Sequence, residues 1–449
     1  MDVAGLARLA SSADRAGAPE AVRDRTVDLV ADVVAACAAA SARPELRRLV
    51  DVRAGLDPDG PATVIGSPRG VPVATAVLLN GAAAAADQLQ DGHRLARGHP
   101  AAHVVPVALA LAEARDLRGA SVLSAVLAGY EVGVRVGMWM GGTPDGVHDI
   151  GTWGQVGVSA TVARLLAPGD VDVMRRAIEL SAAAVLLTDA RTVFAGRTGS
   201  HLFLGASAEH GLSAGLAAVA RLAPEPGSLT RHFAAVTARS PAPAAVEDHE
   251  ILRGYVKRHP TCAHLHGVND AVAELSDVDA HRVVDVEVRT FAGAASFDEV
   301  ADTELAARFS IPTSVAVGLH TGLDGLSAEV VADPAVRALA EKVRVVHDPA
   351  LDDDYPAGRP SRVRVTLDDG TVREASCDRP AWDDDPMLTR EALADKALRL
   401  LRHCFGPAGD EVHAAVLSLA DDAPARHLGS ALRAASRPGE GHASGACAR

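Results

Sequence analysis

The chain has 449 residues, of which 48% are hydrophobic and only 3% aromatic, and its net charge is −14 at pH 7. This length predicts two domains, or one large helical body with a smaller inserted one. Because aromatic side chains are scarce, the core must be built from closely packed Ala, Val and Leu, which favours a mostly helical fold. The acidic balance and the lack of a long basic run argue against nucleic acid or a membrane surface as a partner.

The cysteine spacing and the N-terminal segment indicate the cellular compartment of the protein. The five cysteines are scattered and form no CxxC pair, so neither a disulfide framework nor a zinc ribbon is predicted. The N-terminus lacks a basic start followed by an apolar segment, and Glu131 and Arg135 interrupt the most apolar later stretch. We therefore predict a cytoplasmic protein.

The first half of the chain has helical periodicity. From Pro19 onwards, apolar side chains recur on one stripe of an amphipathic helix. Further helices are expected over 105–119, 120–137, 155–169 and 173–187, the first two as a buried antiparallel pair. No convincing strand is expected before about Tyr255.

The pattern changes after His259. Alternating β-like runs occupy 281–291 and 342–347, and 361–378 reads as a hairpin with Asp369-Gly370 at its turn. Helical spacing returns at 389–404, with Thr389 as the N-cap. We predict a mostly α fold in which residues 1–258 and 389–432 form one large all-helical domain. A smaller α+β domain (259–388) is inserted between its two parts, and the tail 433–449 is expected to be disordered.

Polar side chains are concentrated in the segment DQLQDGHRLARGHP, which follows the run NGAAAAA. Histidines and carboxylates are the usual proton-transfer groups near neutral pH, and arginines bind carboxylates at two points. Pro100 suits the first turn of the next helix, which places the segment on a loop. A solvated loop is the alternative interpretation. The candidate residues are Asp87, Asp91, His93, Arg94, Arg97 and His99.

Three further polar segments are candidates for a site. In GGTPDGVHDIGTWGQ, His148 lies ahead of a helix expected to begin near Thr152 or Gly154, whose free N–H groups favour a carboxylate; the glycines could equally only turn the chain. Domain junctions favour ligand clefts, although histidines there are also common as satisfied core residues. The second segment contains Arg197, Ser200 and His201, and the third contains Lys257, His259, His264 and His266.

Other site classes have little support. His99 and His103 are four residues apart, but no HExxH motif, cysteine partner or carboxylate set accompanies them, so no metal site is predicted. GxGxxG after a strand, GxxxxGK[ST] and GxSxG are all missing from the sequence, which removes the usual nucleotide and hydrolase signatures.

These segments, in this order, resemble the MmgE/PrpD family over nearly the whole chain. The matching stretches include LLNGAAAAADQLQDGHRLARGHP, LAGYEVGVRVG, VHDIGTWGQVGVSATVARLL, RGYVKRHPTCAHLHG and ARFSIPTSVAVGL. The resemblance implies a homodimer, a helical domain made from both chain ends and a smaller α+β lid. It also implies chemistry without a metal or organic cofactor. Such enzymes make or break C–H, C–O or C–C bonds beside carboxylates, using histidines, an aspartate and a lysine between body and lid.

The resemblance also assigns individual positions. His99 matches the histidine of the family's His-Pro step, His148 the histidine of its TGTWG loop, and His266 the histidine after the lid junction. The sequence departs from the family pattern elsewhere: Gln88 stands where many members have an acidic residue, Ser200 where they have a lysine, and Thr313 where they have a tyrosine. We therefore expect a substrate whose charges are placed differently from those of citrate-like acids.

The resulting hypothesis is a cofactor-independent lyase, a dehydratase or decarboxylase, that abstracts a proton next to a carboxylate or carbonyl of a carboxylic acid. His148 acts as base or acid, His99 is its counterpart, and Asp91 or Asp87 orients a histidine. The residues expected to bind the anionic groups of the substrate are Arg94, Arg197, Lys257 and His266. The substrate site is expected to include also Gln88, His93, Thr152, Ser200, His201 and Thr313. The alternatives are an isomerase or epimerase using the same carbanion chemistry, and a non-catalytic dimeric binding protein.

Overall fold

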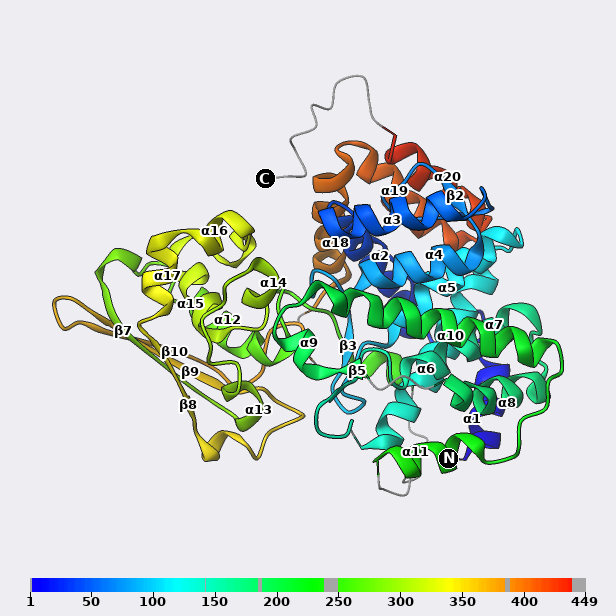
Figure 1. Cartoon of the computed structure of the whole chain (residues 1–449), viewed down its shortest axis with the longest axis horizontal. Helices are drawn as coiled ribbons and strands as arrows, with labels where there is room; N and C mark the ends of the chain where they lie inside the picture. The colour runs from blue at the N-terminus through cyan, green and yellow to red at the C-terminus, as the bar shows by residue number, and fades with distance from the viewer. Residues whose placement is uncertain (1, 142, 185–187, 238–248, 384–387, 438–449) are drawn as a thin grey trace.

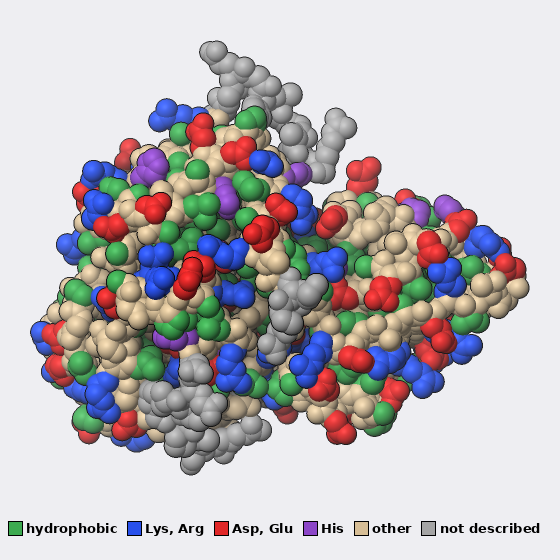
Figure 2. All heavy atoms as spheres, turned by 180° about the vertical axis from the view of Figure 1, so that it is seen from behind, with side chains coloured by type: hydrophobic (Ala, Val, Ile, Leu, Met, Phe, Trp, Pro, Cys, Tyr) green, Lys and Arg blue, Asp and Glu red, His purple; other side chains and the backbone are tan. Residues whose placement is uncertain are grey.

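The computed structural model describes residues 2–141, 143–184, 188–237, 249–383 and 388–437. The described residues form twenty α-helices and ten short strands, so the prediction of a mostly α fold is confirmed. Figure 1 shows a large group of helices and, to one side, a smaller group built around a sheet. On the face seen in Figure 2, acidic and basic side chains are intermixed over both groups.

The larger group contains helices from both chain ends. Its helices are α1 (Val3–Ser12), α2 (Glu20–Ala40), α3 (Pro44–Leu56), α4 (Val73–Ala84), α5 (Pro100–Ala114), α6 (Gly119–Met140), α7 (Gly154–Leu166), α8 (Val171–Leu180), α9 (Ala190–Phe194), α10 (His201–Val219), α11 (Ser228–Thr237), α18 (Arg390–Phe405), α19 (Ala408–Leu417) and α20 (Ala425–Ala435). Helix α18 packs on α2, and α20 packs on α5. One hydrophobic core therefore joins residues that lie more than 360 positions apart, such as Val30 and Leu401.

Small residues allow these helices to pack closely. A Cβ atom added at Gly129 of α6 would lie 2.6 Å from the carbonyl oxygen of Gly157 in α7, and one at Gly157 would lie 2.6 Å from that of Gly129. Since real Cβ atoms do not come this close, only glycine allows the two backbones to touch at this crossing. The scarcity of aromatic residues is thus compensated by backbone proximity.

The smaller group is a four-stranded sheet with helices packed on it. Its strands are β7 (Val283–Thr290), β8 (Val343–His347), β9 (Ser361–Leu367) and β10 (Val372–Cys377), and its helices are α12 (His266–Ala273), α13 (Ala292–Ala295), α14 (Glu304–Ala307), α15 (Ile311–His320), α16 (Ala328–Ala332) and α17 (Pro334–Ala340). The strand order is β10-β9-β7-β8, antiparallel except for the parallel pair β7–β8. The alternating residues Val286 and Val288 are buried in a second hydrophobic core. The predicted hairpin is confirmed, with Gly370 at positive φ in its turn.

The expectation that no strand precedes Tyr255 is wrong in detail. Two-residue strands occur at β1 (Ala62–Thr63), β2 (Gly70–Val71), β3 (Gly92–His93), β4 (Val147–His148), β5 (Thr188–Asp189) and β6 (Gly254–Tyr255). They were missed because pairs this short carry no alternation. Two of the pairings, β3 with β6 and β4 with β5, fix the loops that contain the candidate histidines.

The helix ends follow local sequence signals. Pro100 is at the first position of α5, as expected, and the Thr389 side chain accepts a hydrogen bond from the Ala392 N–H, which confirms it as an N-cap. Helix α20 ends at Ala435, inside the segment predicted to be a tail, and residues 438–449 lie outside the described residues. The domain boundaries at 258/259 and 388/389 remain a prediction.

Two helices, Gly119–Met140 and Thr198–Val219, are long and apolar enough to cross a membrane by length and composition alone. The hydrophobic window of the first is 89% buried inside the protein, and core helices of soluble proteins pass the same test. The cytoplasmic location therefore stays a prediction.

Candidate functional site

The polar segment 87–100 is largely buried, so it is not a solvated loop. Gln88, Asp91, His93 and His99 are all buried between the helices. Strand β3 pairs with β6, which brings the segment beside the chain that leads to Lys257. Buried polar groups need partners, and the partners of each candidate show what it can do.

His99 is positioned as a proton acceptor. It lies immediately before α5, and its Nδ1 is 2.6 Å from the carbonyl oxygen of Asp91, so Nδ1 carries the proton and donates it to that carbonyl. In the neutral ring, Nε2 then has the free lone pair. Burial lowers the pKa of His99 well below its usual value, and the nearby Lys257 adds to this effect. The imidazole is therefore neutral at pH 7.

His148 lies in the short strand β4. Its Nδ1 has two close neighbours, the Ile150 N–H at 3.1 Å and the Asp149 Oδ1 at 3.1 Å. An unprotonated Nδ1 accepts a hydrogen bond from the Ile150 N–H, whereas a protonated Nδ1 donates one to Asp149. The protonation state of Nδ1 therefore decides which of the two hydrogen bonds forms. The Thr152 hydroxyl donates to the His148 carbonyl at 2.7 Å and thereby supports the loop. Burial lowers the pKa of His148, and Asp149 partly opposes this shift.

Asp149 joins the two imidazoles. Its Oδ1 is 3.1 Å from Nδ1 of His148, and its Oδ2 is 3.9 Å from Nε2 of His99. Burial raises the pKa of this carboxyl, which favours sharing a proton with His148. A Cβ atom at Gly98 would lie 2.8 Å from Asp149 Oδ2, so a glycine is needed for this approach. Asp149 was not predicted from the sequence, although it directly follows His148.

Lys257 is fully buried beside this group. Its Nζ donates to the side-chain oxygen of Gln88 at 3.0 Å, so its bonded partner is a neutral amide. Burial lowers its pKa to about 8, while Cys262 and Asp149 act in the opposite direction. At pH 7 most molecules therefore carry a buried positive charge that can bind an anion.

The structure gives the two predicted aspartates other partners. The Asp91 carboxylate accepts from the Ala101 and Ala102 N–H groups, both at 3.0 Å, at the start of α5, and burial raises its pKa to about 7. Its carbonyl, rather than its carboxylate, orients His99.

Asp87 lies in a network of opposite charges. It forms ion pairs with Arg43 and Arg308, and both arginines also contact Glu304. Its carboxylate is thus bonded to guanidinium groups rather than to an imidazole, and the network connects the residue before α3 with Glu304 of α14 and the residue that follows that helix. This geometry favours a structural role.

His93 and Arg94 are also paired with acidic side chains. His93 Nε2 lies 3.2 Å from Glu250, and both side chains are almost fully buried. Arg94 lies 3.1 Å from Asp383, which also binds Arg359. Arg359 in turn stacks on the Tyr255 ring at 4.9 Å. The Arg94–Asp383–Arg359 group was not predicted because its members lie far apart in the chain.

The remaining predicted residues are more dispersed. Arg197 is exposed and Ser200 partly exposed, while His201 is buried 3.5 Å from Glu45. The Thr313 hydroxyl, in α15, accepts from the Ala301 N–H at 2.9 Å and thus holds the loop that contains Ala301. The contacts of His201 and Thr313 are thus with Glu45 and Ala301 rather than with the two imidazoles, and the roles of Arg197 and Ser200 remain predictions.

His266 is different, because it lies close to the charge of Lys257. It is buried and packs edge-on against His259 at 5.4 Å. Burial lowers its pKa well below the usual value, with smaller contributions from His259 and Lys257. In the described parts of the chain, no group of three or more His, Cys, Asp or Glu side chains is arranged to hold a metal ion.

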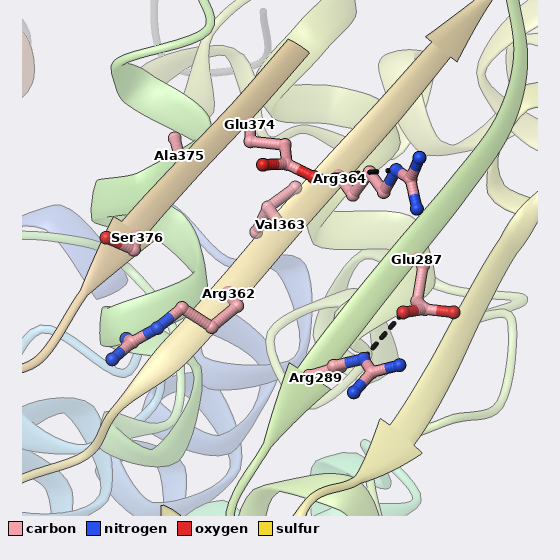
Figure 3. Close-up of a pocket in the computed structure, with 8 residues that line it drawn as sticks. All are labelled: Glu287, Arg289, Arg362, Val363, Arg364, Glu374, Ala375 and Ser376. Atoms are coloured by element: carbon pink, nitrogen blue, oxygen red, sulfur yellow. Dashed lines mark hydrogen bonds and ion pairs between the residues drawn. The ribbon is translucent and has the colours of Figure 1, made fainter. Parts of the chain in front are cut away.

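A cavity of about 440 Å³ lies elsewhere, on the outer face of the sheet (Figure 3). It is lined from β7, β9 and β10, and its arginines are paired with acids of the same face, Arg289 with Glu287 and Arg364 with Glu374. Its lining contains no histidine or lysine. The group around Asp149 is therefore the candidate active site.

Comparison with known proteins agrees with the resemblance found in the sequence. The MmgE/PrpD N-terminal domain model matches residues 4–226, and the MmgE/PrpD C-terminal domain model matches residues 259–422. The chain belongs to the MmgE/PrpD family. It is also similar to two cis-aconitate decarboxylase sequences from Aspergillus terreus, one of them from strain NIH 2624 / FGSC A1156. Each match is 24% identical over 421 residues and covers 84% of both chains.

Proposed function

We propose that this MmgE/PrpD protein is a cofactor-independent lyase that removes a proton from the carbon next to a carboxylate or carbonyl of a carboxylic acid. Its family membership and its similarity to a decarboxylase support a dehydratase or decarboxylase. The observation that carries the proposal is the position of Asp149, whose two carboxylate oxygens face His148 and His99.

The protonation states suit this reaction. His99 is neutral, with the lone pair of Nε2 available as the base. The pair His148–Asp149 shares a proton and supplies the acid. Lys257 carries a buried positive charge that stabilises the negative charge developing on the substrate; one preorganised donor of this kind contributes about 3 kcal/mol to transition-state stabilisation.

The reaction type depends on the substrate atom to which the acid, His148–Asp149, transfers its proton. If His148 protonates a leaving hydroxyl, the product is an unsaturated acid and water. If it protonates carbon instead, the result is isomerisation or epimerisation. Decarboxylation replaces the first proton transfer by loss of carbon dioxide, and the same cation stabilises the resulting carbanion. We further propose that the protein acts as a homodimer and needs no cofactor.

The test is to incubate the protein with di- and tricarboxylic acids in deuterated water and to follow deuterium uptake, water loss and carbon dioxide loss by mass spectrometry. His148→Ala should abolish turnover while the circular dichroism spectrum and the melting temperature are unchanged. His403→Ala, on the exposed face of α18, is the matched control and should behave like the wild type. Unchanged turnover in His148→Ala would reject the catalytic role and favour a binding protein.

A further inference from the structure

Aromatic side chains are unevenly distributed in this chain. It has only seven phenylalanines and three tyrosines, yet four of the former and one of the latter form one connected group with two histidines. The members are His148, Phe194, His264, Phe291, Phe297, Phe309 and Tyr355. The group begins at a proton-transfer residue of the proposed site and continues into the core of the sheet-containing part.

Phe194 is the exposed member beside the site. Its ring is 5.2 Å from the His148 imidazole in an edge-on arrangement, and 39% of the residue remains accessible to solvent. The rings of Phe297 and Phe309 pack against it, with centroid distances of 5.1 Å and 6.0 Å. Figure 1 shows α9, which ends at Phe194, at the junction of the two parts of the molecule. An apolar ring is therefore held in place next to the proposed acid.

The charged side chains near the site indicate where a substrate carboxylate can bind. Arg94 and Arg359 both bind Asp383, and Arg197 is solvent-exposed. Lys257, by contrast, has only the neutral Gln88 as a hydrogen-bond partner within the described segments. No carboxylate of the described residues is hydrogen-bonded to this ammonium group, so a substrate carboxylate can bind there.

We propose that the substrate is an acid with one carboxylate at Lys257 and a planar apolar group, of the size of a phenyl ring, packed on Phe194. This inference rests on the proposed function and deepens it by naming the substrate class. Phe194 is then a specificity-determining residue. Burial of an aromatic group against another ring is worth enough to separate two substrates that differ only in that group.

The chemistry can be written for a 3-hydroxy acid with a phenyl group on C3. His99 takes a proton from C2, and the C2–H electron pair forms the C2=C3 double bond. The C3–O bond breaks, and the hydroxyl group leaves as water with the proton supplied by His148–Asp149. The unsaturated acid is released, and water exchange then returns the two groups to their starting protonation states.

The experiment compares matched acids in deuterated water. 3-Hydroxy-3-phenylpropanoate and malate have the same reacting carbons and differ only in a phenyl group or a carboxylate on C3, and citrate adds the tricarboxylate case. We expect deuterium uptake or water loss with kcat/KM at least tenfold higher for the phenyl acid than for malate or citrate. Turnover of malate or citrate with none of the phenyl acid would overturn the substrate class and leave the proposed function intact. Failure of all three acids would count against both proposals.

Variants test whether Phe194 is responsible. Phe194→Ala should lower the preference for the phenyl acid over malate about tenfold, mainly by raising the KM for the phenyl acid. Leu216→Ala removes another exposed apolar side chain, 41% accessible on α10, and should leave the preference unaltered. An unchanged preference in Phe194→Ala would overturn the assignment. A changed oligomeric state in gel filtration with an unchanged preference would show instead that the ring packs on a second subunit.

Discussion

The contact between Lys257 and Gln88 provides a quantitative prediction. Gln88→Glu replaces the amide oxygen that lies 3.0 Å from Nζ by a carboxylate of nearly the same shape. At this distance and an effective dielectric constant of about 20, the attraction between the two charges is about 5 kcal/mol, or about 4 pKa units. Because the new carboxylate must also be buried, we expect a net rise of about 1–3 units in the pKa of Lys257.

The assay is the pH dependence of kcat/KM. Lys257 binds the substrate only when protonated, so activity in the wild type should fall as the pH rises through about 8. In Gln88→Glu this alkaline limb should move to higher pH by about 1–3 units. Gln88→Met, which keeps the size but provides no charge, should not raise it. An alkaline limb at the same pH in the wild type and in Gln88→Glu, with both proteins folded, would refute the role assigned to Lys257.

Three other substitutions follow from the same geometry. Asp149→Asn should lower kcat by about 10²–10⁴ with little change in melting temperature, because the proton shared with His148 is lost; steady-state kinetics within threefold of wild type would contradict this. Asp91→Ala should lower the free energy of unfolding by about 2 kcal/mol, measured in urea, since two N–H groups at the start of α5 lose their acceptor; an unchanged unfolding midpoint would argue against the cap. Lys396 and Asp32 form a buried ion pair at 2.6 Å between α18 and α2. Lys396→Met should destabilise the fold by about 3–5 kcal/mol because it leaves Asp32 buried and unpaired, and the double variant with Asp32→Asn should recover most of this loss; no recovery would disprove the pairing.

Local sequence signals predicted much of the secondary structure. The hairpin at Asp369-Gly370 and the cap at Thr389 were both found, because turn geometry and capping depend on a few neighbouring residues. The parallel pairing of β7 with β8 was not found, since its partners are separated by more than fifty residues and neither strand encodes the other. The change from helical to alternating spacing after His259 predicted the two-part arrangement, and the family resemblance implied the same one.

The candidate site was predicted by residue type but not by role. The polar segments of the sequence contain His99 and His148, the resemblance matches both to family histidines, and the structure places both beside one carboxylate. That carboxylate, Asp149, was missed because its bridging position depends on a histidine fifty positions earlier in the chain. Asp87 and Asp91 were assigned instead because they lie next to the candidate histidines in sequence. Their partners are arginines and a helix N-terminus, which adjacency in sequence does not reveal.

The most direct test of the proposed mechanism is the transfer of solvent deuterium to the substrate carbon next to the carboxylate, measured by proton NMR in deuterated water for the wild type and His99→Ala. With the proton acceptor at Nε2 of His99, the wild type should incorporate deuterium at that carbon, and the variant should do so at least 100-fold more slowly while remaining folded. Equal rates of incorporation in the two proteins would show that His99 is not the base and would contradict the account.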